Sequence, residues 1–250
     1  MVTIKTKEQI AKMKQAGIIL ADIHKQLRSM IKPGVTTWEI DQFAESYMRS
    51  HGATPEQIGY RGYEYATCAS VNDVICHGFP KREPLQNGDI VKIDMVVNLN
   101  GWLADSAWCY AVGTVSKEAE DLMATTKEAL YRGIAQAKPG NRLGDISHAI
   151  QTFAEERGYS VVRDFTGHAI GQTIHEDPHV PHYGPPGRGL RLKEGMVITI
   201  EPMINTGAYG TKIDADGWTA RTIDGGLSCQ YEHTVAITAD GPYILTDQDE

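Results

Sequence analysis

The chain has 250 residues, of which 41% are hydrophobic and 22% are charged, and these values exclude a mainly disordered protein. The formal net charge is −8, which disfavours direct binding to a nucleic-acid backbone. No apolar run approaches the ~18 residues that a membrane-spanning helix needs. The N-terminal segment is polar and rich in lysine, unlike a signal peptide, and the four cysteines lack the spacing of a disulfide framework. We therefore expect a cytoplasmic protein that binds neither nucleic acid nor a membrane.

The first predicted elements are two helices, over residues 6–31 and 36–52. Each begins with a capping box, in which a threonine and a Gln or Glu three positions later satisfy free amide groups of the first turn. Apolar residues recur every three to four positions along the first helix, which is typical of a helix with one buried face. A Pro-Gly pair at positions 33–34 separates the two helices.

Four short apolar runs follow and predict strands. They cover residues 67–71, 74–77, 90–97 and 103–112. Asn100-Gly101 lies between the last two runs, and this dipeptide favours the tight turn of a β-hairpin. We therefore expect the last two strands to be antiparallel neighbours.

The same order of elements then returns. Helices are predicted over residues 116–137 and, after a second Lys-Pro-Gly, up to residue 158. The segment Leu85–Asp94 resembles Leu192–Glu201, at an offset of 107 (192 − 85). A period this long indicates a duplication and not a solenoid repeat. We expect two α+β halves, residues 1–112 and 113–250, related by an approximate two-fold axis and fused into one domain.

An acidic residue within an apolar strand is the most informative anomaly. Asp94 follows Ile90-Val-Lys-Ile, and burying an unpaired carboxylate is costly. If the hairpin loop has two or four residues, Asp94 and Asp105 share a face of the sheet, directly opposite or diagonal, roughly 5–8 Å apart. Two carboxylates this close repel unless a proton or a cation lies between them, and we favour a cation.

The duplication adds two further carboxylates, Glu201 and Glu232, on matching strands of the second half. His168 supplies a candidate nitrogen ligand. Four carboxylates and one imidazole suit two divalent cations, which bridging carboxylates hold about 3.5–4 Å apart. A set of mostly oxygen ligands favours Mn, Fe(II), Co or Zn in a catalytic role over a structural zinc.

Several motifs together resemble a known family. They are Ser70–Gly78, Val91–Asp94, Asp105, Thr166–His168, His175–Pro178, Ile200–Pro202 and Gln230–His233. Across nearly the whole chain, the sequence resembles the type I methionine aminopeptidases, which share the pita-bread fold with creatinase and prolidase. The resemblance implies an α+β fold around a dinuclear metal centre with the ligands Asp94, Asp105, His168, Glu201 and Glu232. One departure is Ala169, which stands where the family often has glycine.

The resemblance also implies the roles of other residues. His77 and His175 contact the substrate, and Glu201 moves a proton as well as binding metal. The pocket for the methionine side chain maps onto Tyr60, Tyr63, Cys68 and Trp218, with Ile174 beside His175. A monovalent cation, Na⁺ or K⁺, is implied near Asn72, Val74 and Ser228.

We therefore expect a cytoplasmic, monomeric methionyl aminopeptidase that removes the initiator methionine from nascent polypeptides, at the ribosome, and prefers a small second residue. Two alternatives stay open. One is another enzyme of the same fold, an X-Pro aminopeptidase, prolidase or creatinase. The other is a non-catalytic binding protein, which should have lost metal ligands that this chain retains.

Overall fold

In the computed structural model, which describes residues 2–249, both predicted N-terminal helices are present. Helix α1 spans Lys7–Met30 and α2 spans Thr37–Ser50. Each begins at its predicted capping box, in which the threonine hydroxyl accepts a hydrogen bond from the third amide of the helix. The apolar face of α1 packs against the strands of the first sheet.

The first sheet has four strands, and its longest pair is the predicted hairpin. The strands are β1 (Thr54–Pro55), β2 (Cys68–Val71), β4 (Ile90–Leu99) and β5 (Trp102–Ala111), and β4 pairs antiparallel with the other three. Asn100 and Gly101 have φ values of 53° and 82°, as the predicted two-residue turn requires. A short 3₁₀ helix, η1 (Tyr60–Gly62), lies between β1 and β2.

The second half also begins with two helices, α3 (Lys117–Ile134) and α4 (Leu143–Glu155). Helix α3 ends at Ile134, earlier than the predicted Ala137. The reason is that the amides of Gln136 and Ala137 bond to carbonyls only three residues back, which tightens the chain into a turn.

A five-stranded sheet in the order β15-β14-β9-β7-β8 follows these helices. Its strands are β7 (Gly167–Ala169), β8 (Glu176–Val180), β9 (Val197–Ile200), β14 (His233–Thr238) and β15 (Gly241–Ile244). A three-stranded sheet comprises β6 (Ser160–Val161), β10 (Met203–Asn205) and β13 (Ser228–Gln230).

A further three-stranded sheet joins the two halves. Strand β3 (Val74–Cys76) pairs with β12 (Ala220–Thr222), which pairs with β11 (Thr211–Ile213). One hydrophobic cluster also crosses between the halves, and it includes Leu20, Ile93, Leu130 and Val235. The predicted internal symmetry and the boundary at residue 112 stay predictions.

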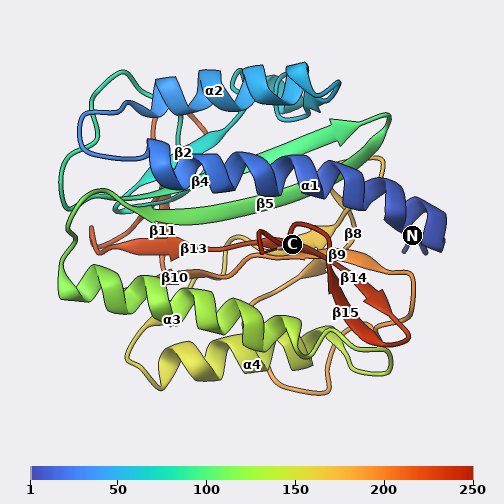
Figure 1. Cartoon of the computed structure of the whole chain (residues 1–250). Coiled ribbons are helices and arrows are strands. Elements are labelled where there is room, and N and C mark those ends of the chain that lie inside the picture. The colour runs from blue at the N-terminus through green and yellow to red at the C-terminus, as the bar shows by residue number, and fades with distance from the viewer. Residues whose placement is uncertain (1, 250) are drawn as a thin grey trace.

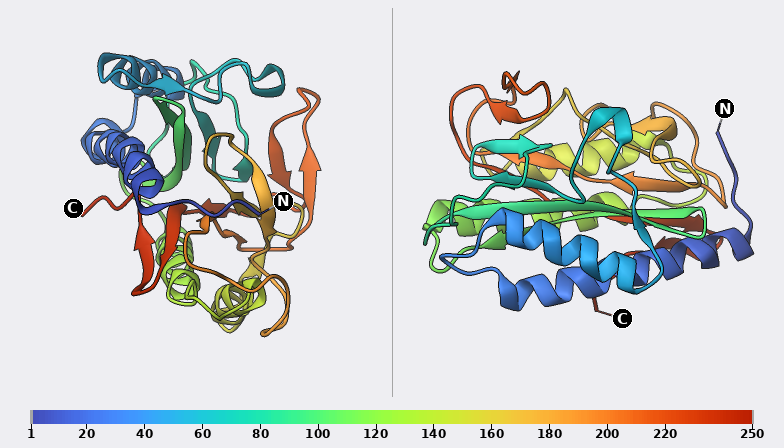
Figure 2. Two further views of the ribbon diagram at one scale, coloured as in Figure 1. Left: turned by 90° about the vertical axis from the view of Figure 1, so that its right-hand side faces the viewer. Right: turned by 90° about the horizontal axis from the view of Figure 1, so that it is seen from above.

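The helices lie outside and the strands inside. Figure 1 shows α1 and α2 on one side of the strands and α3 and α4 on the other. The end-on view in Figure 2 (left) shows the same two helix pairs flanking the strands. Within residues 2–249, no helix combines the length and apolarity needed to cross a membrane.

Candidate metal centre

The β4–β5 hairpin places the first two predicted ligands. Asp105 is the register partner of Val96, and Asp94 is the partner of Ala107. Asp94 and Asp105 are therefore diagonal neighbours on one face of the sheet, as predicted. Both side chains line the same cavity.

The prediction that Glu201 and Glu232 lie within strands is wrong. Strand β9 ends at Ile200 and β14 begins at His233, and these two residues are register partners. Glu201 follows β9 and precedes a proline, which has no amide hydrogen to donate to a ladder. Glu232 precedes β14, and its amide donates to Ala107 of β5 at 2.8 Å. Both glutamates thus lie where the chain leaves one sheet for another, beside the hairpin that carries the aspartates.

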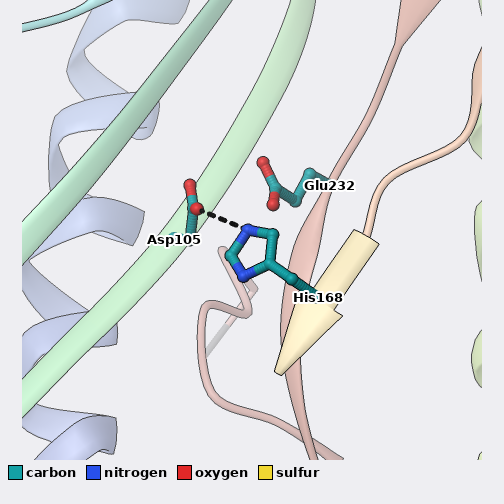
Figure 3. A group of neighbouring side chains, drawn as sticks. All are labelled: Asp105, His168 and Glu232. Atoms are coloured by element: carbon teal, nitrogen blue, oxygen red, sulfur yellow. Dashed lines mark ion pairs between the residues drawn. The ribbon is translucent and has the colours of Figure 1, made fainter. Parts of the chain in front are cut away.

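His168, in β7, completes the cluster. Its Nε2 lies 3.5 Å from Asp105 Oδ2 and 3.6 Å from Glu201 Oε1. Ligand atoms of Asp105, His168 and Glu232 all lie within 4.8 Å of one another. Figure 3 shows these three side chains converging from a strand of the first sheet, from β7 and from the segment before β14.

Several carboxylate oxygens of this cluster are buried and lack a hydrogen-bond partner in the described part of the chain, as is typical of metal ligands. Asp94 Oδ1, Asp105 Oδ1 and both oxygens of Glu232 are buried without a hydrogen-bond partner among residues 2–249. Burial raises the pKa of Asp105 to about 7 and that of Glu201 to about 8. Burial and the neighbouring carboxylates raise the pKa of Asp94 and Glu232 well above the ordinary range. The donor set therefore fits divalent cations, which would remove both the repulsion and the unpaired oxygens.

Backbone and side-chain hydrogen bonds orient His168 and Glu201. His168 Nδ1 lies 3.0 Å from Ala169 O, so Nδ1 carries the proton in this bond and Nε2 is left as a ligand. Thr199 Oγ1 accepts from His168 N at 3.0 Å and donates to Glu201 Oε1 at 2.8 Å. The second oxygen of Glu201 accepts from Gln230 Nε2 at 3.3 Å.

Two further supporting residues were not identified from the sequence. Thr234 Oγ1 accepts from Asp105 N at 2.9 Å and donates to Asp105 O at 2.7 Å. His182 is fully buried, and its Nε2 accepts from Glu201 N at 3.1 Å. Thr199 and Thr234 are polar residues in apolar strands, which is a signal that the sequence did offer.

The cluster lies in a cavity of about 640 Å³. Every residue predicted to contact substrate lines this cavity: Tyr60, Tyr63, Cys68, His77, Ile174, His175 and Trp218. Phe165 and Met203 also line it, and no motif in the sequence had pointed to them. Tyr63 and Trp218 pack edge-to-face with centroids 5.0 Å apart, so one part of the wall is aromatic.

The two predicted substrate histidines differ in their surroundings. The His175 ring lies 4.3 Å from that of His168, and its Nδ1 is 2.7 Å from Tyr60 Oη. His77 packs edge-to-face on Phe165 at 5.3 Å and has a φ of 58°. Burial lowers the pKa of both His77 and His175 to about 4, so both rings are neutral at pH 7 and can each donate one hydrogen bond.

The structure accommodates Ala169, the departure from the usual glycine. Ala169 is buried in β7, where it is the register partner of Ile198 in β9. It is absent from the residues with positive φ, so its backbone does not need glycine.

The predicted monovalent-cation site contains an unexpected side chain. The carbonyl oxygens of Asn72 and Ser228 do face one point, but the ammonium of Lys92 bonds to both, at 3.0 and 2.7 Å. Val74 begins β3, two residues after Asn72.

Metal removal should make the stability of the folded chain fall as pH rises. Carboxyl groups whose pKa is raised in the folded state keep their protons in acid, and they must ionise as pH passes through about 7 and 8, the values for Asp105 and Glu201. Above pH 7 the buried histidines of lowered pKa, such as His77 and His175, are neutral in the folded and the unfolded chain and no longer contribute. At about 1.4 kcal/mol per pKa unit, the loss between pH 7 and pH 8 should be a few kcal/mol. Urea unfolding with a chelator measures it.

Saturating Mn²⁺ is the control for that experiment. Bound cations favour the ionised carboxylates, so the stability of the metal-loaded protein should not fall over the same range. Equal stability of the metal-free protein at pH 7 and pH 8 would contradict the crowding of these four carboxyl groups.

Comparison with known proteins adds independent findings. Residues 11–239 match the model of metallopeptidase family M24. Methionine aminopeptidase 1 of Bacillus subtilis is 48% identical over 246 residues, which cover 98% of this chain and 99% of that protein. The methionine aminopeptidase of Clostridium perfringens is 49% identical, with the same coverage.

Solved structures give the same relationship. The crystal structure of methionine aminopeptidase from Rickettsia prowazekii matches with a TM-score of 0.97 and 44% identity, over 99% of this chain and 100% of that chain. Prolidase from Pyrococcus furiosus matches with a TM-score of 0.79 and 26% identity, and the match covers 98% of this chain but 65% of that chain.

Proposed function

Because the chain belongs to metallopeptidase family M24 and has the pita-bread fold of methionine aminopeptidases and prolidases, we propose that its cavity hydrolyses the bond after an N-terminal methionine. The observation that carries this proposal is the convergence of Asp105, His168 and Glu232 within 4.8 Å beside an aromatic-walled cavity. The enzyme is a metal-dependent hydrolase of the aminopeptidase class, as its relatives are.

Two divalent cations are proposed for the cluster, held by the five predicted ligands Asp94, Asp105, His168, Glu201 and Glu232. The fit rests on the unpaired buried carboxylate oxygens and on the free Nε2 of His168. Mn, Fe(II), Co and Zn all suit this donor set. Such ions, when bound, polarise a carbonyl group and lower the pKa of a water molecule.

Glu201 is proposed to move the proton during hydrolysis. One oxygen of its carboxylate accepts from Thr199 and the other from Gln230, so the group is held in one orientation. A carboxylate in a fixed position can take a proton from water and return it to the leaving amine.

His77 and His175 are proposed to hold the scissile peptide. Both are neutral at pH 7, and Tyr60 occupies Nδ1 of His175, which leaves Nε2 for the substrate. A hydrogen bond to the carbonyl oxygen strengthens as negative charge develops there, so these residues stabilise the transition state more than the bound substrate.

The aromatic part of the cavity is proposed to bind the methionine side chain. Tyr63 and Trp218 form its edge-to-face pair, and Cys68 lines the same cavity. A thioether makes favourable contacts with aromatic rings, each worth ~0.3–1.5 kcal/mol. The substrates are accordingly N-termini of polypeptides, with a small second residue preferred.

The setting of the reaction is part of the proposal. We propose a cytoplasmic, monomeric enzyme that acts on nascent chains at the ribosome. The four cysteines support a reducing compartment, because all of them are buried and free of disulfides.

The alternatives from the sequence are less well supported. The Bacillus, Clostridium and Rickettsia proteins, which match over nearly their full length at 44–49% identity, are methionine aminopeptidases, whereas the chain spans 65% of the Pyrococcus prolidase at 26% identity. A non-catalytic binding protein would not need the five ligands, and all five line one cavity.

A panel of substrates tests the proposed function. With Mn²⁺ supplied, the enzyme should release methionine from Met-Ala-Ser and leave Ala-Pro and creatine unchanged. N-acetyl-Met-Ala-Ser is the matched control, because it keeps the side chain and lacks the free amine, and it should stay intact. Failure to cleave Met-Ala-Ser in the presence of metal would contradict the proposed substrate.

A further inference from the structure

Lys92 is a charged residue in the interior of a strand. It lies in β4, two residues before Asp94 and on the same face, and it is 1% exposed. A buried ammonium group needs compensation for its lost hydration, which in most proteins is a carboxylate. Among residues 2–249, no carboxylate forms an ion pair with Lys92, and its hydrogen-bond partners are two backbone carbonyls.

These two carbonyls come from different halves of the chain. Asn72 lies in the turn between β2 and β3, and its oxygen is 3.0 Å from Lys92 Nζ. Ser228 begins β13, and its oxygen is 2.7 Å from Nζ. The amide of Ser228 also donates to Asn72 O at 3.1 Å, so the two segments touch at this point.

The Asn72 carbonyl is held firmly. Its residue has a φ of 50°, which turns the chain sharply between the two strands. The side chain fixes this conformation, because Oδ1 accepts from Ile90 N at 3.0 Å and Nδ2 donates to Asp89 Oδ1 at 2.8 Å. Rigid, converging carbonyl oxygens are the type of ligand that binds K⁺ and Na⁺ in proteins.

We propose that the Lys92 ammonium takes the place of a monovalent cation and binds the two halves together without Na⁺ or K⁺. The ammonium brings positive charge to the carbonyls and donates hydrogen bonds to both. Its strand carries Asp94, and the strand of Ser228 leads to Glu232. Lys92 is therefore a positioning residue for two of the proposed metal ligands, and it touches neither substrate nor reacting atoms.

The other buried lysine of the described chain has a different environment. Lys5 is 6% exposed, and its ammonium pairs with the Glu176 carboxylate. Lys5 thus compensates its charge in the ordinary way, which makes it the matched control for Lys92.

The first test uses the unaltered, metal-loaded enzyme. Its melting temperature is measured in NaCl, KCl and tetramethylammonium chloride at equal ionic strength. The three values should agree, because the carbonyl site already holds its cation. A rise in melting temperature that is specific to Na⁺ or K⁺ would overturn the proposal.

The second test removes the ammonium. Lys92→Ala leaves two converging carbonyls and an empty space, so its melting temperature should fall and then recover by several degrees in K⁺ or Na⁺ but not in tetramethylammonium. The melting temperature of Lys5→Ala should also fall, but it should not recover in K⁺ or Na⁺. If the melting temperature of Lys92→Ala does not depend on the cation, the proposal that the Lys92 ammonium replaces a monovalent cation is contradicted.

Crystals soaked in Rb⁺ give a direct view of the same point. An anomalous peak between the carbonyls of Asn72 and Ser228 is expected in Lys92→Ala and not in the unaltered protein. A peak at that position in the unaltered protein would overturn the proposal even if Lys92→Ala does not fold. None of these readouts depends on peptide hydrolysis, so they are independent of the proposed substrate.

Discussion

Replacing Asp105 with asparagine should abolish tight binding of divalent cations and lower kcat/KM by about 10³ or more. Asp105 is central to the cluster, because its ligand atoms lie within 4.8 Å of those of both His168 and Glu232 and its Oδ1 has no hydrogen-bond partner in residues 2–249. Metal ions contribute several kcal/mol to transition-state stabilisation, and ~4 kcal/mol corresponds to a factor of ~10³. Asparagine keeps the shape and loses the charge.

Titration calorimetry measures the number of bound ions in this variant. Asp41→Asn is the matched control, since Asp41 is also a buried aspartate but its Oδ1 accepts hydrogen bonds from Thr67 N and Oγ1. The control should bind both ions. Two tightly bound ions in Asp105→Asn would contradict the role of the Asp105 charge in holding them.

Replacing His77 with alanine should lower kcat by roughly 10²–10³ while both metal ions stay bound. This range corresponds to the loss of one hydrogen-bond donor to the transition state, which costs ~2.7–4 kcal/mol. KM should change much less, because an interaction gained only in the transition state affects kcat. Steady-state kinetics on Met-Ala-Ser, with metal content measured in parallel, tests this.

The backbone of His77 requires a second variant as a control. With a φ of 58°, alanine at this position is strained, whereas glycine is not. His77→Gly and His77→Ala should lose the same activity if the imidazole is responsible. Near-normal kcat in fully metal-loaded His77→Gly would contradict a role of the His77 imidazole in catalysis.

Local signals predicted much of the fold. The capping boxes at Thr6 and Thr36 predict where two helices begin, because they depend on residues three positions apart. The Asn100-Gly101 turn determines the register of its hairpin and hence the diagonal placement of Asp94 and Asp105. Each of these features needs only short-range information.

The features that were wrong or missed depend on distant parts of the chain. Glu201 was placed in a strand, although Pro202 marks the point where the chain leaves the ladder. His182 was not identified, because the sequence does not show that its ring accepts from the Glu201 amide. Partners of this kind become visible only when the sheets are assembled.

Lys92 is a second case in which the partners of a buried polar group cannot be predicted from the sequence. A lysine in the apolar run around Asp94 is as anomalous as the acid itself. Its partners are the carbonyl oxygens of Asn72 and Ser228. Every residue has a backbone carbonyl, so the identity of a residue does not show which carbonyl will accept such a bond. Pattern reasoning therefore identifies the charge in the core but not the groups that satisfy it.

Metal analysis of protein purified without oxygen, paired with hydrolysis of Met-Ala-Ser, tests the central claim most directly. The account predicts two divalent transition-metal ions per chain at saturation and release of methionine that a chelator stops and added metal restores. Methionine release that persists in protein stripped of divalent metal would contradict it, as would the absence of release from protein that holds both ions.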